Sequence, residues 1–351
     1  MSFRGFDPTR DVPSLEGKAV LVTGGTSGLG RETVLELARH GPRHVLFTGR
    51  NREAARSLIE ECAPHLLPVA LDGGDNEGET EPENGDRTSN GRGHISFIEC
   101  DHASLASIAA AAEAILTLTP RLDIFIANAG IMATPPGLTA DGLEVQFGTN
   151  HVGNAALLLR LLPLMLRTAS IPGADVRFVS VTSLGYFAHP ARGIDFAALT
   201  TPDGDTGGRP GGAWTRYGQS KLANILLAGE LRRRYGGRIA SVAVHPGTVR
   251  TELVTRLGFW NRMLVYVTNP RGLLSPREGS YGIVWAAAAA DVRDKLAAAT
   301  EGAGGGSKGR GAFFGPVGVP DAGDAKCWDE ELARELWEWS ERTVGVESPP
   351  A

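Results

Sequence analysis

Residues 18–30 read KAVLVTGGTSGLG, an apolar run that leads directly into a glycine-rich turn. A helical pattern follows over residues 31–40, so the turn lies between a predicted strand and a predicted helix. Glycine permits a tight turn and lets the backbone approach a pyrophosphate, which then rests on the helix N-terminus. The spacing is GxxxGxG rather than the GxGxxG of many dinucleotide-binding folds, and a glycine turn without a ligand is the alternative. We expect phosphate contacts from Gly24, Thr26, Ser27, Gly28, Leu29 and Gly30.

Similar apolar runs recur along the chain and alternate with helical patterns. Each run is apolar throughout, which is typical of parallel strands covered by helices on both faces. The pattern predicts an α/β fold, with one Rossmann-like, doubly wound domain over residues 1–351 and a seven-stranded, mostly parallel sheet. The predicted strands are 19–23, 44–48, 95–100, 122–127, 176–181, 239–244 and 312–314. The predicted helices include 31–40, 53–62, 105–118, 154–166 and 217–235.

Three stretches interrupt this alternation. Residues 72–93 are rich in Gly, Asp, Glu and Asn with almost no apolar residues, which predicts a mobile surface insertion. Residues 199–212 are predicted to form a Gly/Pro-rich loop, and residues 301–311 a Gly-rich connector. Predicted strands of one sheet lie on either side of each stretch, so we expect no domain boundary there.

Composition excludes several classes of function. The 351 residues carry a net charge of −5 and an isoelectric point near 5.9, which argues against a nucleic-acid surface. The basic run 232–234 ends a predicted helix, where cations complement the helix dipole. Three scattered cysteines are too few for a disulfide framework or a zinc site, and no His/Cys/Asp cluster has metal-ligand spacing. We therefore expect neither a nucleic-acid partner nor a metal.

Membrane and secretion signals are not expected either. Residues 1–17 have no apolar core of the kind that a signal peptide needs. The apolar stretch 155–166 is interrupted by Arg160 and Pro163 and is too short to cross a bilayer, so we predict a buried helix. A reducing, cytoplasmic location is the expectation.

The sequence YGQSK at 217–221 places Tyr217 and Lys221 four residues apart, on one face of a helix. A free tyrosine has a pKa of about 10, and a neighbouring ammonium lowers that pKa toward a value useful for proton transfer near pH 7. YxxxK spacings occur by chance on many amphipathic helices. Here the motif follows both a glycine-rich turn and a strand that carries serine, and this order favours a proton carrier.

Polar residues also follow the second, third and fourth predicted strands. Arg50, in the sequence TGRN at 48–51, stands where a carboxylate would bind the ribose diol of NAD. Its guanidinium could instead pair with the 2′-phosphate of NADP(H), or bind a surface loop, and Asn51 is expected to cap the next helix. Asp101 either accepts a hydrogen bond from the adenine amine or caps the helix after it. Asn128, at the edge where open α/β sheets bind ligands, either contacts the ligand or ties neighbouring loops together.

These motifs, in this order, resemble the short-chain dehydrogenase/reductase family. The matching pieces cover most of the chain and are TGGTSGLG at 23–30, NAG at 128–130, Asn150, Ser183, YGQSK at 217–221 and HPGTVRT at 245–251. The sequence YGQSKLANILLA and the long connection between Ser183 and Tyr217 resemble the retinol-dehydrogenase-like branch. The C-terminal GAFFGPVG and LARELWEWSERTV are similar to fungal proteins of that branch, many of which tailor secondary metabolites.

The resemblance implies a role for each matched residue. Tyr217 would be the general acid of carbonyl reduction, or the base of the reverse reaction, and Lys221 would lower its pKa and hold the nicotinamide ribose. Ser183, rather than its neighbour Thr182, would hydrogen-bond the substrate oxygen. Asn150 would support a water relay to Lys221, with a helix-breaking structural amide as the alternative.

The resemblance also implies cofactor contacts and a lid near the C-terminal end of the motifs. Val249 and Thr251 match positions that contact the cofactor, and residues 252–280 match a lid over the substrate. Residues 253–266 are strongly apolar, as they would also be in a helix that covers the core. A lid of this composition favours a bulky, apolar or aromatic ketone, aldehyde or alcohol.

The leading interpretation is an NADP(H)-dependent oxidoreductase that moves hydride between the nicotinamide and a carbonyl or hydroxyl carbon of a small molecule. A non-catalytic, NADP(H)-sensing regulatory protein is the alternative, although such proteins commonly lack the tyrosine or the lysine. A sugar-nucleotide dehydratase or epimerase ranks last, because the chain after Pro246 leaves little room for a second domain. His151 and His245 are expected to be structural, and the apolar helices 154–166 and 217–235 predict a homodimer.

Overall fold

Nine strands form one central sheet in this computed structural model, which describes residues 5–69, 92–206, 211–255, 258–268, 272–301, 312–321 and 323–350. The strands are β1 (Ala19–Val22), β2 (His44–Gly49), β3 (Leu66–Pro68), β4 (Gly93–Glu99), β5 (Ile124–Ala127), β6 (Val176–Val181), β7 (Ile239–Val244), β8 (Phe313–Gly315) and β9 (Val319–Pro320). Their order is β3-β4-β2-β1-β5-β6-β7-β8-β9, and every neighbouring pair is parallel except β8 with β9. The predicted doubly wound α/β fold is confirmed.

The prediction of seven strands misses two short ones. Each of the seven lies within two residues of its predicted place, whereas β3 and β9 were not predicted. β3 has three residues and β9 has two, which is too short for a hydrophobic pattern to reveal them. Both end in proline and both lie at an outer edge of the sheet, where the missing amide of proline is tolerated.

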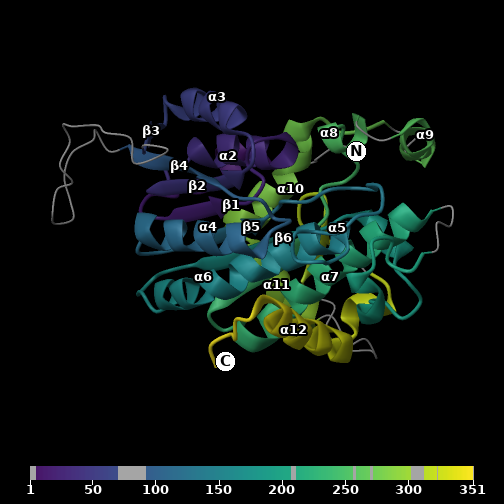
Figure 1. Cartoon of the computed structure of the whole chain (residues 1–351). Helices are drawn as coiled ribbons and strands as arrows, with labels where there is room; N and C mark the ends of the chain where they lie inside the picture. Colours follow the sequence, from purple (N-terminus) through teal and green to yellow (C-terminus); the bar gives the residue numbers. More distant parts are fainter. Residues whose placement is uncertain are drawn as a thin grey trace.

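Helices cover both faces of the sheet (Figure 1). One face carries α1 (Pro8–Asp11), α2 (Gly28–Ala38), α3 (Arg52–Cys62), α10 (Pro276–Ala288) and α11 (Val292–Glu301). The other carries α4 (Leu105–Leu118), α5 (Val145–Phe147), α6 (Gly153–Ala169), α7 (Gly212–Tyr235) and α12 (Glu330–Val344). The remaining elements are α8 (Glu252–Thr255), α9 (Phe259–Thr268), the π-helical turn η1 (Gly148–Val152) and the 3₁₀ turns η2 (Leu184–Ala188), η3 (Phe196–Thr200) and η4 (Ala325–Trp328).

Successive residues of each inner strand enter two different cores. In β1, Val20 and Val22 pack into the core beneath α2 and α10, while Leu21 packs into the core beneath α4, α6 and α7. All three side chains are fully buried. This explains why the strands are apolar throughout, because neither face of the sheet meets water.

The order of the strands reverses at β1, because the chain adds strands first on one side of β1 and then on the other. β2 pairs on one side of β1 and β5 on the other, so the connections after β1 and β5 diverge. Ligands of open α/β sheets bind in the crevice outside the carboxyl ends of the strands at such a switch point. The loops after β1, β5, β6 and β7, which carry the motifs, all leave from this edge.

The predicted buried helix is confirmed in α6. Together with α5 and η1 it forms one apolar helical stretch, Val145–Ala169, which is long and apolar enough to span a membrane. However, 78% of its most apolar window is buried inside the protein, where α6 packs against α4. Pro163 lies within the helix.

α12, drawn in yellow, lies on the outer side of α7 and also contacts α6 (Figure 1). Its buried side chains include Leu332, Leu336 and Trp337, which join the core that α6 and α7 share. The predicted homodimer depends on apolar faces of α6 and α7, and α12 of the same chain packs against both helices. The homodimer stays a prediction.

The three predicted interruptions are only partly described. The insertion predicted over 72–93 lies outside the described residues except at its end, where Gly93 already begins β4. The connector predicted over 301–311 lies outside them except for its first residue, which ends α11. The loop predicted over 199–212 starts later than expected, because η3 continues to Thr200, and its residues 207–210 are not described.

Candidate active site

Close backbone contacts shape the turn between β1 and α2. Gly24 and Gly28 have positive φ angles of 65° and 53°, which favour glycine. A Cβ atom on Gly30 would lie 2.2 Å from the carbonyl oxygen of Gly24, and one on Gly25 would lie 2.7 Å from the Cβ of Phe47. The turn can therefore form a tight cradle only because these positions lack side chains.

The cradle ends at the N-terminus of α2. Ser27 is the N-cap residue, and within the described part of the chain its side chain makes no capping hydrogen bond. The first amides of a helix have no intrahelical acceptor, so they and the helix dipole suit an anion. A Cβ on Gly28 would lie 3.5 Å from Cγ2 of Thr251, and one on Gly49 would lie 2.6 Å from Cγ2 of Thr26. The residues present fit the pyrophosphate of a dinucleotide.

An exposed cation follows β2. The side chain of Arg50 is 70% exposed, and its Nη1 lies 3.9 Å from Oδ1 of Asp101. Asp101 also accepts a hydrogen bond from the Ala103 amide (3.0 Å), whereas Ser104 caps α4, so of the two roles that the sequence left open for Asp101 the capping role does not hold. Asn51 accepts a hydrogen bond from the first turn of α3 and caps it, as predicted. The accessible guanidinium of Arg50 fits a 2′-phosphate group.

Asn128 ties two loops together. Its Nδ2 donates hydrogen bonds to the carbonyl oxygens of Thr23 (2.8 Å) and Gly24 (3.4 Å). Its backbone amide donates to Oγ1 of Thr23 at 2.9 Å. Of the two roles that the sequence left open, these contacts support the joining of the loops after β1 and β5.

Three candidate residues meet where β6, η2 and α7 come together. Ser183 and Tyr217 approach each other at Gly185, where a Cβ would lie 3.4 Å from Oγ of Ser183 and 2.6 Å from Cε1 of Tyr217. Oγ of Ser183 also accepts a hydrogen bond from the Gly185 amide (3.1 Å). Nζ of Lys221 lies 5.7 Å from the centre of the Tyr217 ring. It donates a hydrogen bond to the Val181 carbonyl at 3.2 Å.

Burial controls the ionisation of Tyr217 and Lys221. It raises the pKa of Tyr217 to about 12, although the hydrogen bond with Ser183 opposes this shift, and it lowers the pKa of Lys221 to about 8. Desolvation thus dominates the pKa of Tyr217 in this structure, and the lowering expected from Lys221 stays a prediction. Removing water from a phenol that is 5% exposed disfavours its charged form. Tyr217 carries its proton at neutral pH.

The π-helical turn η1 places Asn150 next to these residues. Its Nδ2 donates to the Ile131 carbonyl and to Oγ of Ser220, both at 2.9 Å, and its Oδ1 accepts from the Ile131 amide at 2.7 Å. A Cβ on Gly130 would lie 2.9 Å from Oδ1 of Asn150 and 3.5 Å from Nζ of Lys221. Asn150 thus fixes the loop after β5 while facing the Lys221 side of the site. Single π-helical turns are frequent at functional sites.

Hydroxyl groups at the carboxyl end of β6 attach α7 to the sheet. Oγ of Ser180 donates to the Asn224 carbonyl (3.0 Å), and Oγ1 of Thr182 donates to the Lys221 carbonyl (2.7 Å). Both side chains face α7 because they are two residues apart on a strand. The Thr182 hydroxyl is therefore engaged with the helix backbone, and Ser183 is the hydroxyl that meets Tyr217.

The loop after β7 packs beside the glycine turn. Val249 is 6% exposed and forms an isolated parallel bridge with Leu274. A Cβ on Gly279 of α10 would lie 2.5 Å from a methyl group of Val249 and 2.8 Å from one of Leu29. Together with the approach of Thr251 to Gly28, this brings both predicted cofactor contacts to the start of α2.

The segment predicted as a lid contains α8 and α9, at the right of Figure 1, and the start of α10. Val254 and Val265 form a small apolar cluster, and four partly buried residues pack against it: Met132, Ala133, Trp214 and Leu273. The Trp214 ring meets the Tyr217 ring edge to face, 6.0 Å between centres. From Pro276 onward the predicted lid belongs to α10, which packs against α2.

Comparisons with known proteins agree with this fold. The KR domain family matches residues 18–141, which include the glycine turn. The short-chain dehydrogenase/reductase drtF of Aspergillus calidoustus is 32% identical over 95% of each chain, and retinol dehydrogenase 14 of Homo sapiens is 35% identical over 98% of this chain and 90% of its own. The solved structure of an uncharacterized protein from Mycobacterium paratuberculosis is 26% identical with a TM-score of 0.64, covering 98% of this chain and 99% of its own.

The chain belongs to the short-chain dehydrogenase/reductase family. The predicted resemblance to its retinol-dehydrogenase-like and fungal branch is confirmed. The protein is therefore an oxidoreductase that acts on CH–OH groups with a nicotinamide dinucleotide.

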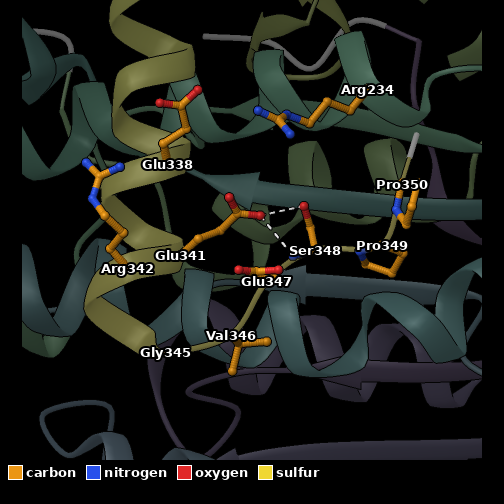
Figure 2. A pocket seen from close by; sticks show the side chains of 10 residues that line it. All are labelled: Arg234, Glu338, Glu341, Arg342, Gly345, Val346, Glu347, Ser348, Pro349 and Pro350. Carbon is orange, nitrogen blue, oxygen red and sulfur yellow. Dashed lines mark hydrogen bonds between the residues drawn. The ribbon is translucent and has the colours of Figure 1, made fainter.

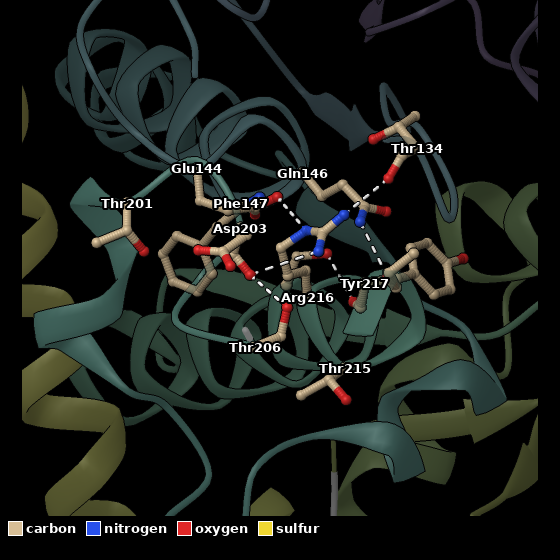
Figure 3. Close-up of polar contacts among 12 residues, drawn as sticks. Thr134, Glu144, Gln146, Phe147, Thr201, Asp203, Thr206, Thr215, Arg216 and Tyr217 are labelled. Carbon is tan, nitrogen blue, oxygen red and sulfur yellow. Dashed lines mark hydrogen bonds and ion pairs between the residues drawn. The ribbon is translucent and has the colours of Figure 1, made fainter. Parts of the chain in front are cut away.

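Sequence reasoning missed several buried polar residues of this short-chain dehydrogenase/reductase. Ser220 links Asn150 to α7, since its Oγ also donates to the Tyr217 carbonyl at 2.7 Å. Arg216 and Glu144 form a buried ion pair directly beside Tyr217 (Figure 3). The position of Arg216 next to the tyrosine was a usable signal. Nothing in the sequence pairs it with Glu144, 72 residues away.

The two histidines next to the motifs make contacts that fit a structural role. Nε2 of His151 lies 3.0 Å from Oγ of Ser340 on α12, and burial lowers the pKa of His151 to about 3. Nε2 of His245 lies 3.2 Å from Asp321, and burial also lowers its pKa. Among the described residues, no group of three or more His, Cys, Asp or Glu side chains could hold a metal ion.

A surface hollow of about 610 Å³ lies away from these motifs, between α12 and the C-terminal residues (Figure 2). Oε1 of Glu341 on its wall accepts hydrogen bonds from the amide (2.9 Å) and hydroxyl (2.5 Å) of Ser348. It also accepts one from Nε1 of Trp337 at 2.9 Å. The carboxylate therefore holds the returning C-terminal segment against α12.

Proposed function

We propose that this short-chain dehydrogenase/reductase uses NADP(H) to interconvert a carbonyl and a hydroxyl group on an apolar or aromatic small molecule. The observation that carries the proposal is the close approach of Ser183 and the buried Tyr217, next to Lys221, at the edge of the sheet that also holds the glycine turn. An acid, a second hydroxyl and a dinucleotide cradle are the parts that hydride transfer to a carbonyl needs.

Each residue of the site has a defined task in this proposal. The nicotinamide supplies the hydride in reduction and accepts it in oxidation. Tyr217 donates its phenolic proton to the substrate oxygen as negative charge develops there, and Ser183 donates a second hydrogen bond to the same oxygen. The Lys221 ammonium then stabilises the phenolate and holds the nicotinamide ribose. Asn150 supports the relay that returns a proton to Lys221.

The glycine turn and its neighbours are assigned to the dinucleotide. The backbone from Gly24 to Gly30 would hold the pyrophosphate, and Asp101 the adenine. Val249 and Thr251 would contact the nicotinamide half. The exposed guanidinium of Arg50 supports NADP(H) over NAD(H), since β2 ends with no carboxylate for a ribose diol.

Replacing Arg50 tests the cofactor assignment. We expect Arg50→Gln to weaken NADPH binding about 10- to 100-fold, because a charged hydrogen bond to the 2′-phosphate is lost. NADH binding should hardly change. Arg56→Gln, an exposed arginine on α3, is the matched control and should change neither. Equal losses for NADPH and NADH in Arg50→Gln would reject the 2′-phosphate contact.

The substrate class is proposed from the lid segment. The apolar cluster around Val254 and Val265 includes Trp214, whose ring meets the Tyr217 ring. An apolar wall this close to the proton donor supports a bulky, apolar or aromatic carbonyl compound as the substrate. Residues 252–275 would form the lid, because α10 already belongs to the sheet's helical layer.

The Tyr217→Phe variant tests the catalytic assignment. We expect NADPH binding to persist and turnover of any carbonyl compound to fall about 10²- to 10⁴-fold, because the proton donor is lost. Tyr235→Phe is the matched control on the same helix. Its hydroxyl bonds the Pro349 carbonyl, and its turnover should equal that of the native protein. NADPH binding by the native protein without oxidation across a panel of aromatic and aliphatic ketones and aldehydes would instead favour the regulatory alternative.

Several further expectations accompany this proposal. A fungal secondary-metabolite tailoring role, a cytoplasmic location, a single-domain organisation and a homodimer stay predictions. Sedimentation at micromolar concentration would decide the homodimer directly.

A further inference from the structure

Arg216 and Glu144 form an ion pair inside the protein, immediately before Tyr217 on α7 (Figure 3). Nε of Arg216 lies 3.0 Å from Oε1 of Glu144. The two side chains are only 3% and 1% exposed, so the pair makes almost no contact with water. The Tyr217 ring extends away from the guanidinium in Figure 3.

The guanidinium reaches two loops as well as the carboxylate. Its Nη2 donates to the Thr134 carbonyl at 2.8 Å, in the loop after β5. Its Nη1 donates to the Asp203 carbonyl at 3.4 Å, in the turn after η3. The stem of Arg216 lies against Gly204, where a Cβ would be 3.1 Å from Cγ of the arginine. The planar guanidinium donates hydrogen bonds to all three acceptors at once. A lysine ammonium on its flexible stem cannot reproduce this geometry.

The carboxylate connects the pair to Asn150. Oε2 of Glu144 accepts the Phe147 amide at 2.7 Å and caps α5, which continues through η1. Asn150 lies in η1, three residues beyond α5. A second contact runs in parallel, because Nε2 of Gln146 donates to the Ala213 carbonyl at 2.9 Å. The start of α5 is therefore bonded twice to the start of α7.

Stability is a poor explanation for a pair of this kind. Removing both charges from water costs about as much free energy as their attraction returns, and apolar residues of similar size often serve as well. What the pair does provide is a fixed geometry. The Glu144 carboxylate and the carbonyls of Thr134 and Asp203 accept hydrogen bonds from the guanidinium, and their positions define where the start of α7 lies.

We propose that the Arg216–Glu144 pair is a positioning device that holds the hydroxyl of Tyr217 in register with Ser183 and Asn150. This inference rests on the proposed function of Tyr217 and assigns the pair no contact with substrate. A displacement of about 1 Å at a reacting group is enough to slow a reaction about 100-fold, so the effect should appear in kcat.

Three variants test the positioning role: Glu144→Gln, Arg216→Lys and the double variant Glu144→Met with Arg216→Met. The double variant removes both charges and leaves neither one unpaired. Each is assayed for NADPH oxidation with the carbonyl compound that the native protein turns over fastest from the ketone and aldehyde panel. We expect kcat to fall about 10- to 100-fold in Arg216→Lys and in the double variant, with a smaller fall in Glu144→Gln. The Kd of NADPH should stay within about threefold of the native value, because the glycine turn is untouched.

A second readout does not depend on activity. The chain has five tyrosines, so ¹³C-tyrosine NMR resolves their titrations, and the Tyr217→Phe spectrum identifies the Tyr217 signal. We expect the titration of Tyr217 to move in Arg216→Lys and in the double variant, because its burial and its approach to Ser183 depend on its position.

An ion pair with a buried carboxylate at the opposite edge of the sheet is the control. Nη2 of Arg121 lies 2.6 Å from Oδ1 of Asp123, whose side chain is fully buried just before β5. Arg121→Lys should lower the melting temperature while leaving kcat per folded molecule and the Tyr217 titration unchanged. A purely structural Arg216 would behave in the same way.

Each outcome decides the proposal. A folded variant without the Arg216–Glu144 pair that keeps the native kcat and the native Tyr217 titration overturns it. If none of the three variants folds, the pair is required for folding and the positioning role is also overturned. If Tyr217→Phe retains turnover, the proposed function fails. If Tyr217→Phe is inactive while the pair variants behave like the native protein, only this inference fails.

Discussion

Lys221 is an ammonium group in surroundings that disfavour its charge. Its side chain is 5% exposed, and burial lowers its pKa from 10.5 to about 8. Between these values the unfolded chain holds a proton that the folded protein has released. The contribution of Lys221 to the free energy of unfolding therefore rises with pH from about 8, by at most about 3 kcal/mol.

Tyr217 limits this gain at higher pH. Burial raises its pKa from 10.0 to about 12, so above pH 10 the unfolded phenol loses a proton that the folded one keeps. The free energy of unfolding then falls as pH rises. Lys221 and Tyr217 thus contribute opposite slopes to the dependence of the free energy of unfolding on pH, and the change from one to the other lies near pH 10.

Lys221→Met should remove the rising slope. Burial also raises the pKa of the three cysteines, which lowers the stability of both proteins above about pH 9. Between about pH 8 and pH 10 we therefore expect the free energy of unfolding to have a more positive pH slope in the native protein than in the variant, as followed by urea unfolding at a series of pH values. Lys295→Met on α11, whose native side chain is 39% exposed, is the control and should keep the native slope. A native slope that survives in Lys221→Met would show that Lys221 is not the group concerned.

At the scale of elements, the glycine turn depends on backbone contacts that a side chain would block. Gly30 lies against the carbonyl of Gly24, and the side-chain amide of Asn128 donates a hydrogen bond to the same carbonyl. The distance between β1 and the first turn of α2 is set by these contacts. Any Cβ at Gly30 must push the two elements apart.

Gly30→Ala should therefore cost about 1–3 kcal/mol of stability and weaken NADPH binding, because the cradle opens. Gly229→Ala is the control on α7, where a Cβ would meet nothing within 4 Å. There we expect stability to rise by about 0.5–1 kcal/mol, since alanine favours a helix. Thermal unfolding and NADPH titration measure both effects. Equal behaviour of the two variants would contradict the role of the close contact.

Sequence patterns predicted the elements that are long and strongly apolar. α4 was predicted with its observed bounds, 105–118, and β6 and β7 likewise, because their runs are bounded by turn residues. β3 and β9 were missed because they are too short for a period to show. The start of α7 was predicted five residues late, since it begins with glycine rather than with a capping side chain.

At the scale of the whole molecule, contacts far apart in sequence explain what was missed at the site. The motifs placed Tyr217, Ser183 and the glycine turn at one edge of the sheet, and the structure brings them together there. The Arg216–Glu144 pair joins segments 72 residues apart, and no periodicity records such a contact. The pKa of Tyr217 could not be predicted either, because burial depends on every element packed around the phenol.

α12 illustrates the same limit. Its apolar residues were seen in the sequence as a family resemblance only, yet the helix packs against both α6 and α7. Its Ser340 also contacts His151, the residue after Asn150. The C-terminal end of the chain therefore belongs to the layer that supports the site.

Transfer of deuterium from NADPH that is fully deuterated at C4 of the nicotinamide tests the central claim most directly. The native protein, Tyr217→Phe and Tyr235→Phe are each incubated with the carbonyl panel, and the alcohols formed are analysed by mass spectrometry. We expect one deuterium on the former carbonyl carbon with the native protein and with Tyr235→Phe, and almost no product with Tyr217→Phe. Labelled alcohol formed by Tyr217→Phe at the native rate would contradict the role of Tyr217 as the proton donor.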